Sequence, residues 1–398
     1  MSHSPNLFDL PMPDAEAAAH SERLATLIRM EIAQAGGCIS FARYMELALY
    51  APGLGYYSAG ARKFGAAGDF VTAPEISSLF ARCLARQVAQ ALRALGRGDI
   101  IEAGAGSGVM ACDLLRELEA LDCLPERYFI LEVSASLRAR QRALLQERAP
   151  QLLGRVTWLD ELPQTPWRGV VLANELPDAM PVHLFRMEHD GASELYVSWH
   201  NDKFTWRDGA LSHAALQERI TAIVAELREQ GEELPSGYRS EINLAAEGWV
   251  RSIAAQLEAG LLLIIDYGFP RREYYHPQRA AGTLLCHYRH RAHADPLLWP
   301  GLQDITAHVD FTALAEAASG AGLHVAGYTT QASFLIACGL MDLAAQSPDL
   351  RQRVEIAQQI KKLTLPGGMG ELFKAIAFTR ALDVSLQGFA LQDLRGRL

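Results

Sequence analysis

Apolar and polar residues alternate in blocks along the central part of the chain. Short apolar runs, such as DIIEA at 99–103 and GVVLANE at 169–175, are followed by segments with helical spacing, such as 107–120 and 135–148. Short apolar runs are typical of buried strands, and strands that alternate with helices predict right-handed βαβ units. The pattern therefore predicts an α/β domain with a mainly parallel sheet.

The alternation of strands and helices breaks after residue 181. Residues 182–208 have a two-residue period around Asp190-Gly191, which predicts an antiparallel hairpin, and a polar helix is predicted over 212–231. The α/β pattern then resumes. It predicts a helix over 241–258, a strand at 260–268, a long irregular segment over 268–309, a helix over 310–321, a strand at 324–330, two more helices and a last strand at 373–380.

The first hundred residues predict a helical region interrupted by one loop. A helix is predicted to begin at Ser21, a good N-cap residue, and to stop at Gly36. Residues 51–75 are rich in glycine, alanine and aromatic residues and have no helical period. Long ordered loops of this kind are commonly functional. The whole of 21–50 is predicted to be helical, and a further helix is predicted over 76–95.

Composition narrows the class of protein. Of the 398 residues 49% are apolar and 21% are charged, which is typical of a globular protein. The net charge of −9 argues against unspecific binding to nucleic acid or anionic lipid. The longest apolar run is shorter than the roughly 20 residues of a membrane span. We expect no nucleic-acid partner and no membrane insertion, and the pattern specifies no oligomeric state.

The cysteines and the N-terminal segment bear on the location of the protein. The six cysteines are scattered without a CxxC pair, which favours reduced thiols and a reducing compartment. The first twenty residues are acidic and contain proline, unlike a secretory signal or a transit peptide. We therefore expect a cytoplasmic location.

A glycine loop, EAGAGSG, follows the first strand of the α/β pattern. Glu102 ends the strand, and Gly104, Gly106 and Gly108 lead into a helix. A dinucleotide site has the spacing G-x-G-x-x-G, whereas here the third glycine comes one position early and a carboxylate precedes the loop. This form suits S-adenosyl-L-methionine (SAM), which is cationic and has no phosphate. A turn that only allows close packing is the alternative, and the loop alone is a weak signal.

Carboxylates after the next two strands strengthen the prediction of a nucleoside ligand. Glu132 ends the second strand, where folds of this kind bind ribose hydroxyls. Asp160, just past the third strand, is a weaker candidate for the adenine amino group. Because the glycine spacing disfavours a nicotinamide-dependent oxidoreductase, the predicted cofactor is SAM, with S-adenosyl-L-homocysteine as its product.

Seven stretches spread over nearly the whole chain match a known family. They are GYY (55–57), GDFVTAPEIS (68–77), EAGAGSG (102–108), LEVS (131–134), NELPDAMPVHLF (174–185), DYG (266–268) and DITAHVDF (304–311). In these stretches the chain resembles the MidA-type family of class I SAM-dependent methyltransferases. The resemblance implies a seven-stranded, mainly parallel Rossmann-like sheet. It also implies SAM-dependent methylation of a protein arginine, since mitochondrial members assist assembly of respiratory complex I by dimethylating an arginine of a core subunit.

The resemblance also assigns roles to segments. The GDFVTAPEIS loop, with Asp69, Thr72 and Pro74, would border the cofactor. Four segments follow: an N-terminal helical cap with this loop over 1–97, the first half of the SAM-binding domain over 98–181, an inserted hairpin and helix over 182–240, and the second half over 241–398. The hairpin of the inserted segment is either a candidate docking surface for a protein partner or plain decoration of the fold, and 268–309 is expected on the acceptor side.

Two carboxylates follow the fourth strand, at the carboxyl edge of the sheet where ligands of such folds bind. We expect Glu175 and Asp178 to orient the acceptor guanidinium through paired hydrogen bonds and to assist loss of its proton. The resemblance matches both positions but not Asn174. In the alternative reading, Glu175 caps the next helix or pairs with a surface arginine, and Asp178 is solvated.

Other polar residues are weaker candidates for the acceptor pocket. Each also has a plain structural reading, and His308 is not matched in the mitochondrial relatives. Cys286, His287, His290 and His293 have a spacing that superficially suggests zinc, but no second ligand pair follows and arginines surround them, so we expect no metal. The candidates for the acceptor pocket are Asp266, His290, His293, Asp304, Thr306 and His308.

The leading functional hypothesis is SAM-dependent methylation of a protein arginine, with a respiratory complex subunit as a candidate substrate. A small-molecule methyltransferase and a non-catalytic SAM-binding assembly factor are the alternatives. The first would methylate free metabolites, and the second would bind a partner without methyl transfer.

Overall fold

The computed structural model describes residues 10–59, 71–346 and 349–398. The chain divides into two compact units. The α/β unit consists of 71–177, 247–269 and 311–398, and the second unit of 1–70, 178–246 and 270–310. This grouping differs from the four predicted segments because the helix over 78–95 belongs with the α/β unit. The functional roles given to those segments stay predictions.

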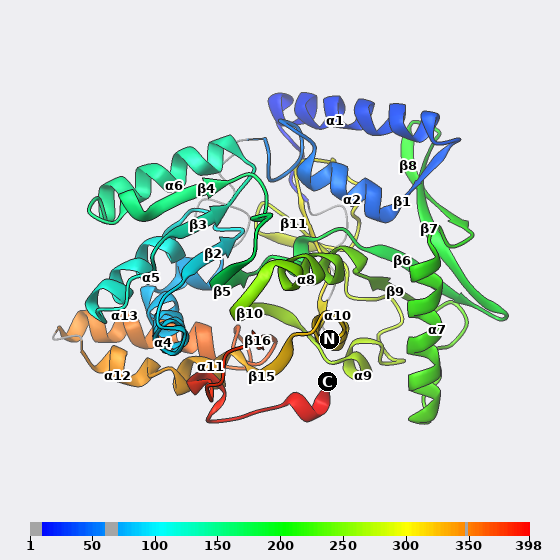
Figure 1. The fold of residues 1–398 in the computed structure, drawn as a ribbon. Coiled ribbons are helices and arrows are strands. Elements are labelled where there is room, and N and C mark those ends of the chain that lie inside the picture. Colours follow the sequence, from blue (N-terminus) through cyan, green and yellow to red (C-terminus); the bar gives the residue numbers. More distant parts are fainter. Residues whose placement is uncertain (1–9, 60–70, 347–348) are drawn as a thin grey trace. The chain divides into compact units, whose positions relative to one another are not determined.

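The α/β unit is built around one sheet (Figure 1). Its strands follow the order β15-β16-β10-β5-β2-β3-β4. Neighbouring strands from β4 to β10 are parallel, whereas β16 is antiparallel to both β10 and β15. The predicted mainly parallel class I fold is confirmed. The strands are β2 (Asp99–Ala103), β3 (Tyr128–Leu131), β4 (Val156–Leu159), β5 (Trp167–Asn174), β10 (Leu257–Phe269), β15 (His324–Thr330) and β16 (Phe373–Arg380).

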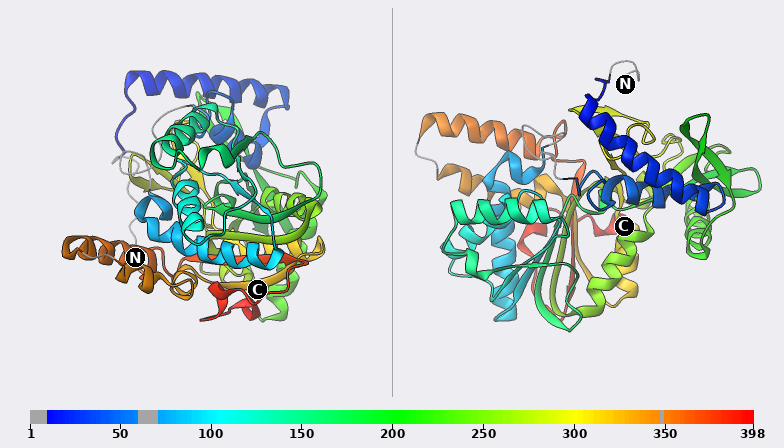
Figure 2. Two further views of the ribbon diagram at one scale, coloured as in Figure 1. Left: turned by 60° about the vertical axis from the view of Figure 1, so that its left-hand side comes forward. Right: turned by 90° about the horizontal axis from the view of Figure 1, so that it is seen from above.

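Helices cover both faces of this sheet. Figure 2 shows α4 and α5 on one face and α8 and α10 on the other. Residues 170–173 of β5 and 261–265 of β10 are therefore buried at every position, which explains their continuous apolar runs. Among the described residues between β15 and β16 there are three helices, not the predicted two. The helices are α3 (Ala73–Ile76), α4 (Ser78–Leu95), α5 (Val109–Ala120), α6 (Ala135–Arg148), α8 (Leu244–Gln256), α10 (Phe311–Gly320), α11 (Gln331–Ala337), α12 (Leu340–Ala345) and α13 (Leu350–Thr364).

The second unit contains a five-stranded antiparallel sheet. The predicted hairpin forms its centre, as β6 and β7, and β8 continues it through a turn at Asn201-Asp202. Strands β1 and β9 add to the edges, and each is too short for a sequence period to reveal. The elements are β1 (Cys38–Ser40), α2 (Phe41–Tyr50), β6 (His183–Glu188), β7 (Gly191–His200), β8 (Lys203–Gly209), α7 (Ala214–Glu229) and β9 (Arg239–Ile242).

The first helix begins earlier than predicted. Helix α1 spans Ala15–Gln34, and its N-cap is Asp14, whose carboxylate accepts a hydrogen bond from the Ala17 amide at 2.9 Å. Ser21 is not the cap. It is buried within the helix, and its hydroxyl donates to the Pro300 carbonyl at 3.0 Å.

The segment over 268–309 is more regular than predicted. It contains a short helix and a three-stranded antiparallel sheet in the order β12-β11-β13. The carboxylate of Glu241 is buried here and accepts hydrogen bonds from the backbone amides of Thr283 (2.9 Å) and Leu284 (3.1 Å). The elements are α9 (Arg271–Tyr274), β11 (Leu285–Tyr288), β12 (Arg291–His293), β13 (Asp304–Thr306) and β14 (Val309–Asp310).

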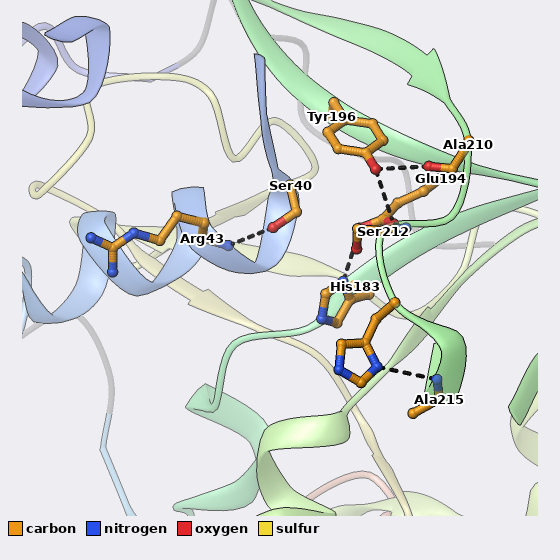
Figure 3. Close-up of polar contacts among 9 residues, drawn as sticks. Ser40, Arg43, His183, Glu194, Tyr196, Ala210, Ser212 and Ala215 are labelled. Atoms are coloured by element: carbon orange, nitrogen blue, oxygen red, sulfur yellow. Dashed lines mark hydrogen bonds and ion pairs between the residues drawn. The ribbon is translucent and has the colours of Figure 1, made fainter. Parts of the chain in front are cut away.

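A second buried carboxylate organises the five-stranded sheet. Glu194 of β7 accepts hydrogen bonds from the Ser212 amide (2.6 Å) and the Tyr196 hydroxyl (3.4 Å), and it pairs with His183 at 2.9 Å (Figure 3). Burial raises the pKa of Glu194, but its hydrogen bonds with His183 and Ser212 outweigh this effect and hold the pKa below its usual value. These hydrogen bonds compensate the buried charge of Glu194, which fits a structural role for this acid.

Candidate functional site

The glycine loop turns sharply between β2 and α5. Gly104, Gly106 and Gly108 have φ angles of 72°, 52° and 85°, a left-handed conformation that favours glycine. A Cβ atom on Gly108 would also lie 3.1–3.2 Å from atoms of Gln141 in α6. These glycines therefore serve both the turn and the close packing that the sequence analysis held as the alternative.

Glu102 provides a buried carboxyl group at the start of the loop. Its side chain is 0% exposed, and Oε2 accepts a hydrogen bond from the Tyr128 hydroxyl at 2.7 Å. Oε1 has no hydrogen-bond partner among the described residues. Burial raises the pKa of Glu102 to about 7, with the Tyr128 hydrogen bond opposing the rise. A cationic ligand would stabilise the ionised form, so the group fits the positively charged SAM.

Glu132 follows β3 directly and is also buried. Its Oε1 accepts a hydrogen bond from the Ser134 amide at 2.9 Å, and Oε2 accepts one from Gln141 Nε2 at 3.3 Å. Burial raises the pKa of Glu132. The carboxylate is held in a defined orientation at the carboxyl end of its strand, which fits the predicted binding of ribose hydroxyls.

Two residues near Glu132 are largely exposed. Val133 directly follows Glu132 and is a large apolar residue that is 75% exposed. The sequence analysis did not single it out, although its position beside Glu132 was an available signal. The side chain of Asp160 is 84% exposed and pairs with Arg138 at 2.7 Å. Its role at the adenine stays a prediction.

The GDFVTAPEIS stretch reaches the glycine loop through α3. Asp69 lies outside the described residues, Thr72 is at the N-cap position and Pro74 is buried in the first turn. The Ser107 hydroxyl of the glycine loop donates a hydrogen bond to the carboxylate of Glu75 in α3. This contact agrees with a position beside the cofactor, and the binding roles of Asp69, Thr72 and Pro74 stay predictions.

Glu175 forms a hydrogen bond with the N-terminal end of α3. Its Oε1 accepts hydrogen bonds from the backbone amide of Ala73 (3.1 Å) and from Asn174 Nδ2 (3.2 Å), and its own amide donates to the Ile265 carbonyl at 2.9 Å. Its φ of 49° is left-handed, a conformation that costs a non-glycine residue about 1–2 kcal/mol. Glu175 thus caps a helix, but the helix is α3 and not the next one in the chain.

Asp178 follows in the second unit, within a 3₁₀ turn over Pro177–Ala179. Its side chain is only 5% exposed, so the alternative of a solvated carboxylate is wrong. Its carbonyl accepts a hydrogen bond from the Ala307 amide at 2.9 Å. This bond ties the turn to the residue that follows β13.

Asp178 belongs to an acidic–aromatic cluster, which we define as Tyr50, Tyr57, Asp178 and Asp304. The Tyr57 hydroxyl donates to Oδ1 of the buried Asp304 at 2.8 Å, and the rings of Tyr50 and Tyr57 stack with centroids 5.5 Å apart. Burial raises the pKa of Tyr57, and the negative charges of Asp304 and Asp178 raise it further. Two carboxylates and two aromatic rings therefore form one cluster, in which the negative charges act on the Tyr57 hydroxyl.

The remaining candidates are spread over both units. In the α/β unit, Asp266 is buried near the end of β10, where its Oδ1 accepts a hydrogen bond from the Tyr267 amide at 2.8 Å. In the second unit, Thr306 donates to the Leu285 carbonyl at 3.3 Å, and the His308 amide donates to Thr283 Oγ1 at 3.0 Å. Their roles at an acceptor stay predictions.

Two of the three histidines of the zinc-like spacing, His290 and His293, lie in different surroundings. His290 is exposed at the β11–β12 turn, whereas His293 is buried on β12, opposite Cys286, and burial lowers its pKa. Within residues 10–59, 71–346 and 349–398, no group of three or more His, Cys, Asp or Glu side chains could hold a metal ion. Over the same residues, no helix has the length and apolar character needed to cross a membrane.

The strand order, the glycine loop, the buried Glu102 near the end of β2 and the buried Glu132 directly after β3 define the class of protein as a class I SAM-dependent methyltransferase. The chain belongs to the family described as "Putative S-adenosyl-L-methionine-dependent methyltransferase", whose model matches residues 83–329. The resemblance found in the sequence is thereby confirmed, together with the SAM cofactor.

Individual relatives agree with this family. The zebrafish (Danio rerio) protein arginine methyltransferase NDUFAF7, mitochondrial, is 30% identical over 85% of this chain and 83% of its own. The human (Homo sapiens) protein of the same name is 28% identical over 86% and 80%. A crystal structure from Burkholderia thailandensis, bound to S-adenosyl-homocysteine, is 48% identical with a TM-score of 0.93, covering 98% of this chain and 100% of its own.

These relatives correct one expectation. The predicted cytoplasmic location is wrong on this comparison, because the curated eukaryotic relatives are named as mitochondrial proteins. The prediction rested on reduced thiols and on the composition of the first residues. Reduced cysteines do not distinguish the cytoplasm from other reducing compartments.

Proposed function

We propose that this SAM-dependent methyltransferase transfers methyl groups to an arginine side chain of a protein. The observation that carries the proposal is the acidic–aromatic cluster, in which two buried aspartates accompany two stacked tyrosines. The relatives named as protein arginine methyltransferases support the same acceptor. A subunit of a respiratory complex is the candidate substrate that the family resemblance suggests.

The chemistry of the cluster suits a guanidinium group. Carboxylates bind the planar guanidinium through paired, charge-assisted hydrogen bonds, and aromatic rings attract the cation through their faces. A neutral metabolite would offer neither a planar set of charged donors nor a cation for the ring faces.

The reaction needs positioning and removal of one proton. Bound SAM supplies an electrophilic methyl group: the new N–CH₃ bond forms as the S–CH₃ bond breaks, and the bonding electron pair stays on sulfur. The methylated guanidinium nitrogen gives up one proton. Asp178 is our candidate to orient the guanidinium and to accept this proton, with Asp304 as the second carboxylate and Tyr57 holding Asp304 in place.

This assignment separates the two carboxylates that the sequence analysis paired. Oε1 of Glu175 accepts hydrogen bonds from Ala73 and Asn174. We propose that Glu175 is a positioning residue for α3 beside the cofactor, and that Asp178 acts on the acceptor. Loss of Glu175 should then weaken SAM binding, whereas loss of Asp178 should not.

The test compares Asp178→Asn and Asp304→Asn with wild-type protein. Methyl transfer from labelled SAM to proteins of an extract from cells lacking this gene gives the activity, and calorimetric titration with S-adenosyl-homocysteine gives cofactor affinity. Asp190→Asn, in an exposed hairpin turn, is the matched control. We expect at least a hundredfold loss of transfer with Asp178→Asn and cofactor affinity within twofold of wild type. Full transfer by Asp178→Asn would overturn the proposal.

A further inference from the structure

Gln141 is a buried polar residue on the inner face of α6, and no motif of the sequence pointed to it. Its side chain is 0% exposed, and only Leu145 is buried with it on this helix. A buried amide has to satisfy all its hydrogen-bonding groups inside the protein. Its partners therefore indicate what the residue is for.

Gln141 joins three parts of the cofactor site. Its Nε2 donates to the Gly106 carbonyl of the glycine loop at 2.9 Å and to Glu132 Oε2 at 3.3 Å. Its Oε1 accepts a hydrogen bond from the indole Nε1 of Trp158 on β4 at 2.8 Å. Both amide hydrogens and the amide oxygen are thus engaged.

Trp158 determines which way the amide points. An indole N–H can only donate, so the amide oxygen of Gln141 has to face Trp158 and the NH₂ group has to face the glycine loop and Glu132. The guanidinium of Arg142 lies over the Trp158 ring at 4.6 Å and supports its position. The orientation of Gln141 therefore follows from the donor and acceptor chemistry of its neighbours.

We propose that Gln141 is a positioning residue that fixes the Glu132 carboxylate for the ribose hydroxyls of the cofactor. Glu132 is held through Oε1 by the Ser134 amide and through Oε2 by Gln141. A carboxylate has about four acceptor positions, so both oxygens keep capacity for two ligand hydroxyls. The inference rests on Glu132 as the ribose ligand and not on the identity of the methyl acceptor.

The same contacts explain a requirement for glycine. Gln141 is bonded to the Gly106 carbonyl and packs against Gly108, where a Cβ would come within 3.2 Å of its backbone and side chain. The loop and the ribose carboxylate are therefore positioned by one side chain. We therefore expect a substitution of Gln141 to reduce the affinity of the site for the ribose hydroxyls while the protein still folds.

The test uses S-adenosyl-homocysteine and its 2′-deoxy analogue as probes in calorimetric titrations. Wild-type protein should prefer the ribose form by about tenfold or more, since a hydrogen bond to a charged group is at stake. Gln141→Leu should weaken binding of S-adenosyl-homocysteine about tenfold more than binding of the deoxy analogue, which loses only the support of the loop, so that the preference disappears. Gln146→Leu, on the exposed face of α6, should behave as wild type.

A purely structural role predicts a different pattern. In that case Gln141→Leu would weaken the binding of both probes equally, and the preference for the ribose form would remain. That result would overturn the proposal. Trp158→Phe provides a second test if Gln141→Leu does not fold, because it removes the indole donor and leaves an aromatic ring. It should reduce the preference for the ribose form, and an unchanged preference would contradict the inference.

Discussion

The buried carboxyl of Glu102 should reduce stability at neutral pH and favour cofactor binding, and Glu102→Gln separates the two effects. Burial raises the pKa of this group from 4.5 to about 7, so the folded protein holds the proton more tightly than the unfolded chain. Protonated Glu102 contributes fully to the free energy of unfolding below pH 4.5, the pKa in the unfolded chain. This contribution is lost as the pH rises from 4.5 through about 7, the pKa in the folded protein. The loss amounts to about 3 kcal/mol at pH 8, at about 1.36 kcal/mol per pH unit.

Glutamine keeps the acceptor for the Tyr128 hydroxyl and carries no charge. We expect Glu102→Gln to have nearly the same melting temperature as wild type at pH 4.5, and a higher one at pH 8. Thermal unfolding across this pH range is the assay, and Glu147→Gln, exposed on α6, is the control. A variant that is no more stable than wild type at pH 8 would refute the reasoning.

The ionisation of Glu102 that lowers stability as the pH rises should strengthen cofactor binding. With a pKa of about 7, roughly a tenth of Glu102 is ionised at pH 6 and most of it at pH 8, so wild-type affinity for S-adenosyl-homocysteine should rise about tenfold between them. Glu102→Gln should bind weakly at both values, because it cannot compensate the ligand ammonium. If Glu102→Gln bound S-adenosyl-homocysteine as tightly as wild type and with the same pH dependence, a group other than Glu102 would interact with the ligand charge.

Three further substitutions test separate parts of the site. Gly108→Ala should weaken S-adenosyl-homocysteine binding at least tenfold in titrations, because φ is 85° and the added methyl meets Gln141; unchanged affinity would contradict this. Glu175→Leu should lower the same affinity several-fold by releasing Ala73, whereas Glu175→Gln keeps an acceptor oxygen and should stay within threefold; equal effects would contradict the positioning role. Tyr57→Phe should slow methyl transfer about tenfold in the labelling assay at unchanged cofactor affinity, and undiminished transfer would exclude a role for its hydroxyl.

The strands and helices of the α/β unit could be predicted because their burial produces a clear period. Residues 170–173 of β5 and 261–265 of β10 are covered on both faces, so these stretches are apolar at every position and stand out. The two edge strands β1 and β9 have three and four residues, which is too few for a period. The early start of α1 was missed because Asp14 and Ser21 are both good N-cap residues.

The candidate site was predictable where it lies at strand ends. Glu102 is the penultimate residue of the buried strand β2 and Glu132 follows β3 directly, and position alone suggested them. Tyr57 and Asp304 lie 247 positions apart, and Gln141 and Gly106 come from different elements, so no spacing in the sequence relates them. Such contacts depend on how the chain folds back on itself, which local patterns do not encode.

The central claim is that arginine is the methyl acceptor, and identification of the labelled residue tests it most directly. Purified protein, methyl-labelled SAM and an extract from cells lacking this gene are combined, and labelled products are digested and sequenced by mass spectrometry. We expect methylated arginine in a small number of proteins, and none when Asp178→Asn replaces wild type. Label on a different side chain or in small molecules would contradict the claim.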